Sequence, residues 1–465
     1  MTNPTEQAQR VFLEGSGLLQ KGNSAAALVY FQQANDIAPS NPVILLHAGT
    51  ALHNLERYEE AIACYHAAIR VAPRIGEVHN NLGNSLMALG RFADAADSFA
   101  LAAQLLPLSP VPQAARATAL QALGFITEAE TDCRNALLIA PDFANAHWNL
   151  ALNLLLQGRY HEGWTEYEWR WQKPDFTSPC RHTDIPLWDG SPLHDRTILL
   201  HAEQGFGDAI QFVRYVPLVA SCGGNILLEC HPQLVSLFQG IKGISSVVAF
   251  GEQIPACDCQ APFLTLPRIF GTTLENIPAS LYLPVPTERL EKWHQRTAPY
   301  SGPRVGIVWA GSSIHRNDNF RSMPLAFLSS LAKFTDIKFF SLQMGDAKYQ
   351  LGLSPLAEHV VDLTDQICDF ADTAALIEQL DLVICVDTAV AHLAGTLGKP
   401  VHLMLPFAPD WRWLLERNDS PWYPTMRIFR QKQPGDWVEV MNRIHSDLDN
   451  LTCYNKKSFE VAPKD

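Results

Sequence analysis

The first third of the chain repeats one pattern of apolar, small and polar positions every 34 residues. In each of four units a proline closes the pattern and a small residue recurs in the first predicted helix; in the second helix an aromatic residue recurs in three units and a cysteine takes its place in the fourth. In chain order these positions are Pro39, Pro73, Pro107 and Pro141; Gly15, Gly49, Gly83 and Ala117; and Phe31, Tyr65, Phe99 and Cys133. A period of 34 predicts paired antiparallel helices, with small residues allowing close approach and aromatic rings filling the space between neighbouring repeats. A fifth unit continues the pattern but lacks the closing proline. With this unit included, the array is expected over residues 8–171.

From residue 197 onward, short apolar runs typical of buried strands alternate with helical stretches. Strands are expected at 197–201, 225–230, 246–250, 263–266 and 281–284, and then at 304–309, 338–342, 382–386 and 399–405. Helices are expected over 209–221, 324–334 and 436–450, and from Asp387 through Thr396; we expect the helix at 436–450 to cross back to the first sheet. This alternation predicts two open parallel sheets that face each other, with a ligand crevice at the carboxyl ends of their strands.

The predicted fold class is therefore α plus α/β, a helical solenoid followed by two Rossmann-like domains. The expected domains are residues 1–171 for the solenoid, 172–196 for an ordered connector, 197–300 and 301–450 for the two sheet domains, and 451–465 for a tail.

Composition excludes several functional classes. The net charge of −13 argues against a nucleic-acid partner, because such proteins carry excess positive charge. The N-terminus has no apolar signal region and no apolar run approaches the roughly 20 residues of a transmembrane span, so a cytoplasmic protein is expected. The ten cysteines are scattered without metal-ligand spacing, so neither a metal site nor a disulfide framework is expected.

Three clusters of polar residues follow predicted strands. In the first, Gln204-Gly205-Phe-Gly207-Asp208, the glycines allow close backbone approach to a ligand, and Asp208 is placed to accept a proton from an acceptor hydroxyl. The alternative interpretation of Asp208 is an ordinary helix cap.

The second cluster combines hydroxyl and guanidinium groups after the strand at 304–309. Ser312 and Ser313, with Arg316 and Arg321 further along the loop, suit a diphosphate group. The alternative is a solvated loop with surface arginines.

The third cluster is Asp387-Thr388, at the start of a helix whose free N–H groups favour phosphate, with His392 one turn later. The alternative is that Asp387 caps the helix and His392 packs in the interior. Further along, four tryptophans (Trp411, Trp413, Trp422 and Trp437) are more typical of structural anchors than of sugar stacking, and Trp411 and Arg412 are the residues of this segment expected to line the crevice.

Together these motifs resemble a known combination of domains. The 34-residue units are similar to tetratricopeptide repeats, and the region from 197 to 445 resembles heptosyltransferase-like, family 9-like glycosyltransferases of the GT-B architecture. The resemblance implies that Asp208 is the general base and that Asp387, Thr388 and His392 contact the donor nucleotide-sugar. It also places Ser312, Ser313 and Arg321 at the diphosphate. The segment 405–413, with 420–424, is similar to a subgroup fused to such repeats.

Two positions depart from the heptosyltransferase pattern. Ala389 stands where those enzymes usually have a glycine. The chain also lacks the glutamate that they use to bind the ribose, and Asp346 is the residue expected to replace it. These departures leave the sugar and the base of the donor open.

The sequence thus predicts a metal-independent glycosyltransferase without a cofactor that uses a nucleotide-diphosphate sugar. The repeats are expected to bind a protein or peptide acceptor, with Asn80, Asn81, Asn84, Asn145 and Asn149 as residues for clamping its backbone. The rival hypothesis is a non-catalytic repeat scaffold with a degenerate transferase domain. A serine hydrolase is disfavoured, because the chain has no Gly-x-Ser-x-Gly sequence.

Overall fold

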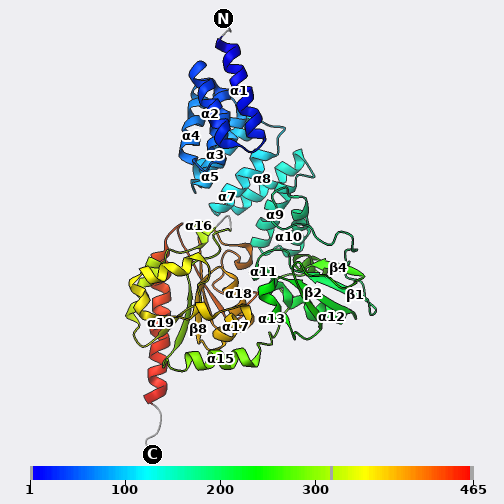
Figure 1. Cartoon of the computed structure of the whole chain (residues 1–465), viewed down its shortest axis with the longest axis vertical. Coiled ribbons are helices and arrows are strands. Elements are labelled where there is room, and N and C mark those ends of the chain that lie inside the picture. Colours follow the sequence, from blue (N-terminus) through cyan, green and yellow to red (C-terminus); the bar gives the residue numbers. More distant parts are fainter. Residues whose placement is uncertain (1–3, 315–317, 461–465) are drawn as a thin grey trace, which may run out of the picture. The chain divides into compact units, whose positions relative to one another are not determined.

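A computed structural model of the chain describes residues 4–314 and 318–460. The chain divides into two compact units, Met1–Leu154 and Leu155–Asp465, and Figure 1 shows the helices and strands of both. The domain limits drawn from the sequence remain predictions.

The first unit consists of helices, and each of the first seven packs on the next helix along the chain. They are α1 (Pro4–Gln20), α2 (Ser24–Ile37), α3 (Pro42–Asn54), α4 (Tyr58–Val71), α5 (Gly76–Ala88), α6 (Phe92–Leu105), α7 (Val111–Ala122), α8 (Ile126–Ile139) and α9 (Ala144–Leu156), which runs into the second unit. The hairpin repeat predicted from the period of 34 residues is confirmed.

The recurring glycines lie directly beneath the recurring aromatic rings. A methyl group on Gly49 would come within 2.5 Å of the Tyr65 ring, and one on Gly83 within 2.5 Å of the Phe99 ring. Each ring therefore packs first inside its own helix pair, which the sequence did not predict. Contact with the next repeat also exists, because the ring centroids of Phe31 and His47 are 5.8 Å apart.

Gly83→Ala is expected to lower the free energy of unfolding of the first unit by about 1–3 kcal/mol, because the added methyl group must displace the Phe99 ring. Chemical denaturation measures the change. The control is Gly17→Ala, where nothing lies within 4 Å of the added methyl group and a gain of about 0.5–1 kcal/mol is expected from helix propensity. Equal changes at both positions would contradict the packing argument.

The second unit starts with α10 (Tyr160–Tyr167) and the 3-10 helix η1 (Glu168–Gln172), followed by the first sheet. Its strands β1 (Thr197–His201), β2 (Asn225–Cys230), β3 (Ile244–Ala249) and β4 (Cys259–Pro262) are parallel, in the order β3-β2-β1-β4. The helices around it are α11 (Phe206–Phe212), α12 (Val216–Ser221), α13 (Val235–Phe238) and α14 (Leu266–Ile269).

Three expectations for this sheet domain were wrong. The strand expected at 263–266 is a short helical turn, because β4 already ends at Pro262, and 281–284 contains no strand. The helix expected over 209–221 begins at Phe206 and is interrupted by a 3-10 turn at Val213–Tyr215. Pro217 explains the interruption, since proline lacks the N–H that a continuous helix needs.

The second sheet has six parallel strands in the order β10-β9-β8-β5-β6-β7. They are β5 (Arg304–Val308), β6 (Lys338–Ser341), β7 (Val360–Asp362), β8 (Leu382–Val386), β9 (Val401–Leu405) and β10 (Met426–Arg430). Its helices are α15 (Thr287–Thr297), α16 (Asp318–Arg321), α17 (Phe370–Glu378), α18 (Ala389–Thr396) and α19 (Trp437–Glu460). Two parallel sheets are thus confirmed, and β7 and β10 are additions to the prediction.

Two helical predictions in this domain were wrong in detail. The helix expected at 324–334 is the 3-10 helix η5 (Leu325–Lys333). The helix expected to cross back to the first sheet is α19, and its apolar residues Trp437, Val440 and Ile444 lie in the core of the second sheet domain, where α19 packs on η5 and β10. Its apolar face is therefore already buried within its own domain.

Candidate functional site

The two sheets each contain one point where the strand order reverses. In the first sheet the chain proceeds from β1 to β2 and β3 on one side, and β4 lies on the other; in the second sheet, β5 and β8 are the neighbours at which the order reverses. Parallel sheets bind ligands outside the carboxyl ends of strands at such points. Asp208 follows β1, the loop with Ser312 follows β5, and Asp387 follows β8. All three predicted clusters therefore lie at reversal points.

The first and third clusters are in direct contact. Helix α11 of the first sheet domain packs on α18 of the second, and the two helices lie close together in Figure 1. A methyl group on Gly207 would come within 2.8 Å of His392 Cδ2, so only glycine fits at this crossing. The two sheet domains thus meet at the residues that the sequence singled out.

Asp208 lies in the first turn of α11, where both of its oxygens accept hydrogen bonds. Gly205 N–H donates to Oδ2 at 2.9 Å, so the carboxylate caps the start of α11, and the Arg412 guanidinium donates to Oδ1 from the opposite domain. Its side chain is 19% exposed, so the carboxylate still reaches solvent. The cap interpretation and a functional role are therefore compatible.

Arg412 connects the two domains from the 3-10 helix Trp411–Trp413. Its Nε donates to Gln211 Oε1 at 2.6 Å, its Nη1 to Asp410 Oδ1 at 2.9 Å, and its Nη2 to Asp208. Asp410 and Asp208 raise the pKa of this buried guanidinium, against the effect of burial. Arg412 therefore remains positively charged at the junction of α11 and the 3-10 helix.

The third cluster combines a neutral histidine with a buried carboxylate. Burial, followed by Arg412, Arg214 and Arg321, holds the pKa of His392 well below its usual range. Its Nδ1 shares a hydrogen bond of 2.9 Å with the Tyr423 hydroxyl, and Nε2 lies 3.9 Å from Asp387 Oδ1. His392 is therefore a buried, neutral imidazole whose Nε2 edge faces Asp387.

Thr388 forms the N-cap position of α18, and its buried hydroxyl has no hydrogen-bond partner. A buried hydroxyl without a partner gains a hydrogen bond when a ligand or a water molecule binds beside it. The N–H groups at the start of α18 lie beside it, which favours an anion.

The loop after β5 contains a glycine beneath a guanidinium group. A methyl group on Gly311 would come within 2.7 Å of both Arg321 Cζ and Asp318 Oδ1. Arg321 Nε donates to Asp318 at 3.2 Å, and Ser322 accepts the Gly311 N–H at 2.9 Å. This fixes Arg321 close to the turn that follows β5.

The two predicted serines of this loop are accessible to solvent. Ser312 and Ser313 are exposed on the same turn, and Arg316 lies outside the described residues.

Among the other predicted residues, Trp411 does not line an open crevice. It is 3% exposed, and its ring packs edge-on against Trp164 and Tyr160 of α10, with centroid distances of 5.1 and 6.3 Å. Its role here is that of an anchor, as the wider group of tryptophans was expected to be. Gln204 accepts a long hydrogen bond of 3.5 Å from the Tyr167 hydroxyl.

Sequence reasoning missed several residues that shape the site. Asp410 and Gln211 hold Arg412, Trp413 stacks on the His392 ring at 5.3 Å, and Gln343 accepts the N–H groups of Trp309 and Ala310. The only local signal was the position of Asp410 directly before the Trp-Arg-Trp segment. The other partners come from distant parts of the chain.

Asp387 lies in an unfavourable electrostatic environment. Burial, together with the nearby Asp410, raises its pKa to about 6, and Arg321 and Arg412 only partly offset this. The ionised form of Asp387 is therefore less stable in the folded chain than in water.

Asp387→Asn is expected to stabilise the second unit at pH 7.5 by about 2–3 kcal/mol. The pKa of Asp387 is higher in the folded chain than in the unfolded chain, so the folded state is favoured when this carboxyl group is protonated. Asp387 therefore does not reduce stability at acid pH, and it reduces stability as the pH rises through about 6. The gain in the variant should therefore disappear near pH 4. Thermal unfolding across this range measures it.

The control for this pH series is Asp419→Asn. Hydrogen bonds from Arg417 lower the pKa of Asp419, so this substitution should not stabilise the chain at any pH. A gain for Asp387→Asn that does not change with pH would contradict the account.

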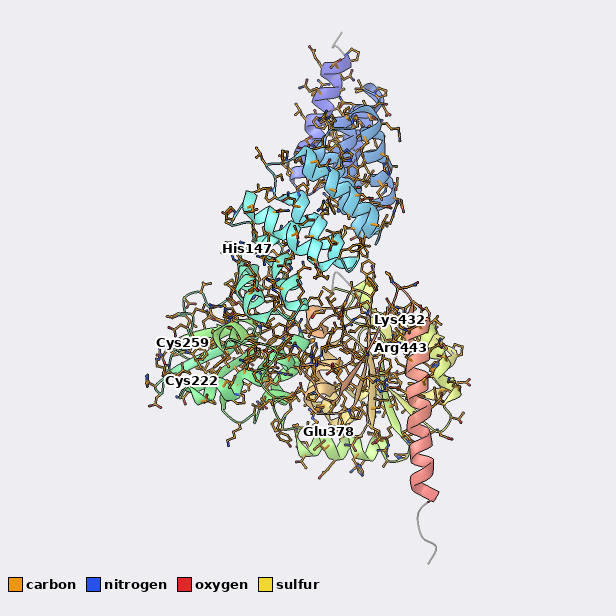
Figure 2. All side chains as sticks on the ribbon, turned by 180° about the vertical axis from the view of Figure 1, so that it is seen from behind. His147, Cys222, Cys259, Glu378, Lys432 and Arg443 are labelled. Carbon is orange, nitrogen blue, oxygen red and sulfur yellow. The ribbon has the colours of Figure 1, made fainter. Side chains whose placement is uncertain are left out.

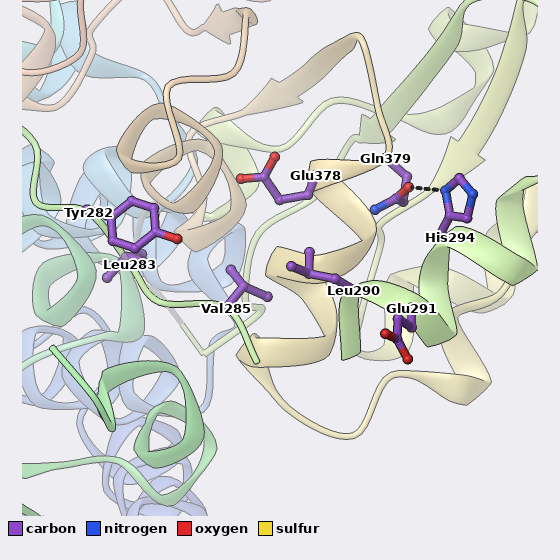
Figure 3. Close-up of a pocket in the computed structure, with 8 residues that line it drawn as sticks. All are labelled: Tyr282, Leu283, Val285, Leu290, Glu291, His294, Glu378 and Gln379. Carbon is purple, nitrogen blue, oxygen red and sulfur yellow. Dashed lines mark hydrogen bonds between the residues drawn. The ribbon is translucent and has the colours of Figure 1, made fainter. Parts of the chain in front are cut away.

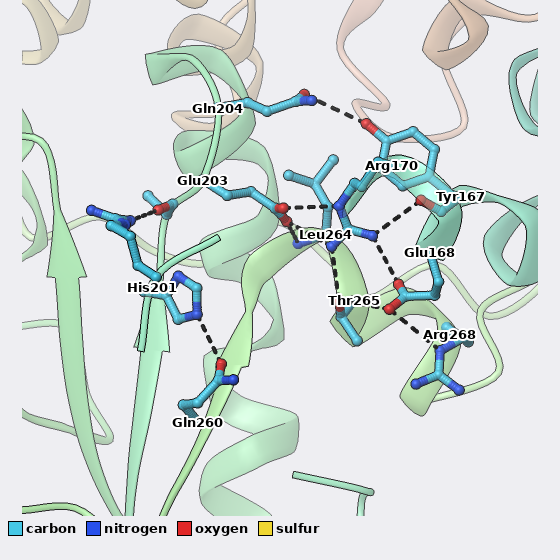
Figure 4. Close-up of polar contacts among 12 residues, drawn as sticks. Tyr167, Glu168, Arg170, His201, Glu203, Gln204, Gln260, Leu264, Thr265 and Arg268 are labelled. Carbon is cyan, nitrogen blue, oxygen red and sulfur yellow. Dashed lines mark hydrogen bonds and ion pairs between the residues drawn. The ribbon is translucent and has the colours of Figure 1, made fainter. Parts of the chain in front are cut away.

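A buried ion-pair network joins η1 to the end of β1 (Figure 4). Arg170 is fully buried; its Nε and Nη2 donate to Glu203 at 2.9 and 3.1 Å, and Nη2 also donates to Thr265 at 2.8 Å. Glu203 directly precedes Gln204 and accepts the Leu264 N–H at 2.9 Å. The network therefore fixes the chain just before the Gly205–Asp208 turn.

A cavity of about 510 Å³ is lined by Tyr282, Leu283, Val285, Leu290, Glu291, His294, Glu378 and Gln379 (Figure 3). Glu378 and Gln379 lie at the end of α17, just before β8 begins. The cavity is thus at the edge opposite to the one at which parallel sheets bind ligands.

Within residues 4–314 and 318–460, no group of three or more His, Cys, Asp or Glu side chains is arranged to hold a metal ion. None of the helices described combines the length and apolar character of a membrane span. The nine cysteines from Cys64 to Cys385 are free thiols; Cys222 and Cys259 are labelled in the first sheet domain in Figure 2.

Comparison with known proteins supports the same division of the chain. A tetratricopeptide repeat model matches residues 46–110, and the model for glycosyltransferase family 9 (heptosyltransferase) matches residues 361–402, a range that includes Asp387 and His392. The chain therefore carries N-terminal tetratricopeptide repeats and a glycosyltransferase family 9 domain, and its two parallel sheets are consistent with the GT-B architecture.

Among individual proteins, the chain is a distant homologue of Protein FlbA of Caulobacter vibrioides. The two are 28% identical over 438 residues, an alignment that covers 87% of this chain and 72% of FlbA. Similar solved structures include MamA of Desulfovibrio magneticus, with 16% identity and a TM-score of 0.32, covering 36% of this chain and 92% of MamA. A thermophilic TPR protein of Thermus thermophilus has 22% identity and a TM-score of 0.31, covering 35% of this chain and 88% of its own.

Proposed function

We propose that this protein transfers a sugar from a nucleotide-diphosphate sugar to an acceptor hydroxyl. The observation that carries the proposal is the convergence of three motifs, one from the first sheet and two from the second, at the reversal points of both sheets. The contact of Gly207 with His392 brings the motifs after β1 and β8 together. A family 9 domain that includes the third motif supports a nucleotide-sugar donor.

The donor diphosphate is proposed to bind between the loop after β5 and the start of α18. Arg321 supplies charge-assisted hydrogen bonds, Ser312 and Ser313 supply exposed hydroxyls, and the unpartnered Thr388 hydroxyl supplies another. Asp346, exposed after β6 on the same edge of the sheet, is the residue proposed for the ribose.

Asp208 is proposed to act as general base. It takes the proton of the acceptor hydroxyl while the acceptor oxygen bonds to the anomeric carbon of the sugar. The bond from this carbon to the phosphate oxygen breaks, and the nucleoside diphosphate leaves with the electron pair. Arg321 and the N–H groups of α18 stabilise the developing negative charge in place of a metal ion.

The repeats are proposed to bind a protein or peptide acceptor. Asn81 and Asn149 already donate to Thr50 and Thr118 of the preceding repeats, at 3.2 and 3.0 Å. The side-chain carbonyl oxygens of Asn80 and Asn145 lack partners, and Asn84 is exposed. These three residues are therefore the ones proposed to contact an acceptor backbone.

The experiment incubates the full chain with UDP-glucose, UDP-N-acetylglucosamine, GDP-mannose and ADP-glucose, and measures release of the nucleoside diphosphate with and without a pool of unmodified proteins. The proposal predicts that one donor is consumed and that the protein pool accelerates its consumption, with a matching mass increase on an acceptor. No release from any donor, with no binding of nucleoside diphosphates, would favour the non-catalytic scaffold.

A further inference from the structure

Arg412 has the geometry of a residue that fixes another side chain rather than one that binds a ligand itself. Its Nε, Nη1 and Nη2 each donate to a different acceptor: Gln211, Asp410 and Asp208. Two of these acceptors belong to α11 of the first sheet domain. Because a guanidinium group is planar and rigid, three such bonds determine both its position and its orientation.

The Asp208 carboxylate is correspondingly fixed. Oδ1 accepts from Arg412 and Oδ2 accepts from Gly205 N–H at 2.9 Å, so the carboxylate cannot rotate without losing one of the two bonds. The arrangement therefore holds the carboxylate in one orientation.

Arg412 is in turn held through its neighbour Trp411 by α10. The Arg412 guanidinium lies 4.2 Å from the Trp411 ring centroid, and Trp411 packs edge-on against Trp164 at 5.1 Å. The Tyr160 hydroxyl accepts a hydrogen bond of 3.1 Å from Trp422 Nε1, which closes this aromatic cluster. The pattern of the sequence assigned α10 to the repeats, but its side chains pack against the transferase segment.

We propose that Arg412 is a positioning residue for Asp208, and that α10 holds Arg412 in place through the cluster of Tyr160, Trp164, Trp411 and Trp422. The proposal rests on the proposed transferase function. It adds a chain of contacts that connects α10 through Trp411 and Arg412 to the carboxylate of Asp208.

The test compares full-length Arg412→Gln and Arg412→Lys with the wild type. Turnover is followed as release of nucleoside diphosphate from the four donors named above, and affinity as calorimetric binding of UDP, GDP and ADP. Arg412→Gln is expected to lower kcat about 100-fold, since a displacement of about 1 Å in a reacting group has an effect of this size. Arg412→Lys keeps the charge but reaches fewer acceptors and is expected to retain about a tenth of wild-type kcat. Donor KM and nucleoside diphosphate affinity should stay within about threefold of wild type, because the donor is proposed to bind elsewhere.

Two further variants distinguish the loss of Asp208 positioning from the loss of any arginine–aspartate pair in this loop. Arg417→Gln removes another arginine–aspartate pair of the same loop, at 2.6 Å from Asp419 and largely exposed, and should leave turnover unchanged. Tyr160→Phe removes the hydroxyl that accepts the hydrogen bond from Trp422 Nε1 in this cluster. It should lower kcat severalfold without changing donor KM. Circular dichroism checks that each variant folds. If Arg412→Gln does not fold, the kcat and donor KM of Tyr160→Phe and Arg412→Lys test the proposal in its place.

Three results would overturn the proposal. Turnover of the Arg412 variants equal to that of Arg417→Gln would show that Asp208 needs no positioning. A loss of nucleoside diphosphate affinity as large as the loss of kcat would make Arg412 a donor-binding residue instead. A wild-type chain that releases nothing from any donor would contradict the proposed function itself, and this role with it.

Discussion

Arg170→Ala is expected to lower the free energy of unfolding of the second unit by about 3–5 kcal/mol, because it leaves a buried carboxylate without its cation. Glu203 is 1% exposed and takes two hydrogen bonds from Arg170. The same substitution also removes the donors to Thr265 and Glu168. Denaturant unfolding followed by tryptophan fluorescence measures the change, since Trp171 lies directly against Arg170.

The control is Arg268→Ala. Arg268 lies 3.9 Å from Glu168 of the same network but is 41% exposed, so a loss of less than about 1 kcal/mol is expected. A similar loss at both arginines would contradict the argument from burial.

The pH dependence gives an independent check on Arg170. Burial raises the pKa of Glu203 even with Arg170 present. A group whose pKa is raised on folding contributes most to stability at acid pH, and its contribution is lost as the pH rises. The defect of Arg170→Ala should therefore shrink as the pH is lowered, because a protonated Glu203 needs no cation.

This network also determines how the repeats can be removed. Deletion of residues 1–171 would take away Arg170 together with α10, so we expect the remainder to be unstable. Deletion of residues 1–141 keeps α9, α10 and η1, and is expected to impair modification of a protein acceptor more than hydrolysis of the donor. Equal impairment of both reactions would point to a role of the repeats in folding.

The second large effect is expected for Asp208→Asn, which should lower turnover by about 100- to 10,000-fold, the usual contribution of a general base. The amide has nearly the shape of the carboxylate and can still accept the Gly205 N–H, so the fold of the turn should be kept. Because the base acts on the acceptor, nucleoside diphosphate affinity should change by less than about threefold.

Asp419→Asn is the matched control for this variant. Asp419 belongs to an exposed ion pair with Arg417, and its replacement should leave kcat unchanged. Unchanged turnover in Asp208→Asn would refute the base assignment, and loss of donor affinity in step with turnover would move Asp208 to the donor site.

The sequence predicted the parts of the fold that depend on regular spacing. The 34-residue period identified the helix pairs, and apolar runs of five or six residues identified β1, β2, β5 and β8. Other elements were not predicted: β7 has only three residues, and β10 carries the charged Arg427 and Arg430 among its apolar residues. The apolar run at 263–266, which was expected to be a strand, is a helical turn. The fifth unit of the helical pattern also gave no sign that α10 packs within the second compact unit.

The candidate site was predictable only where its residues form local motifs. Asp208, Asp387 and His392 stand out because each lies in the first turn of a helix that follows a strand, or directly before that helix. The partners of Arg412 were not predictable, since Arg412 and Gln211 are 201 residues apart in the chain. Nor could spacing show that His392 is buried and uncharged, because its low pKa comes first from burial and then from three arginines that folding brings near it.

The central claim is that the loop after β5 and the start of α18 bind the diphosphate of a nucleotide-sugar. The most direct measurement is a calorimetric titration of the full chain with UDP, GDP, CDP and ADP, repeated with Arg321→Gln and with Asp208→Asn. The account predicts that one nucleoside diphosphate binds, that Arg321→Gln weakens it at least about tenfold through loss of a charge-assisted contact, and that Asp208→Asn leaves it nearly unchanged. Absence of binding for all four, or binding that is indifferent to Arg321, would contradict it.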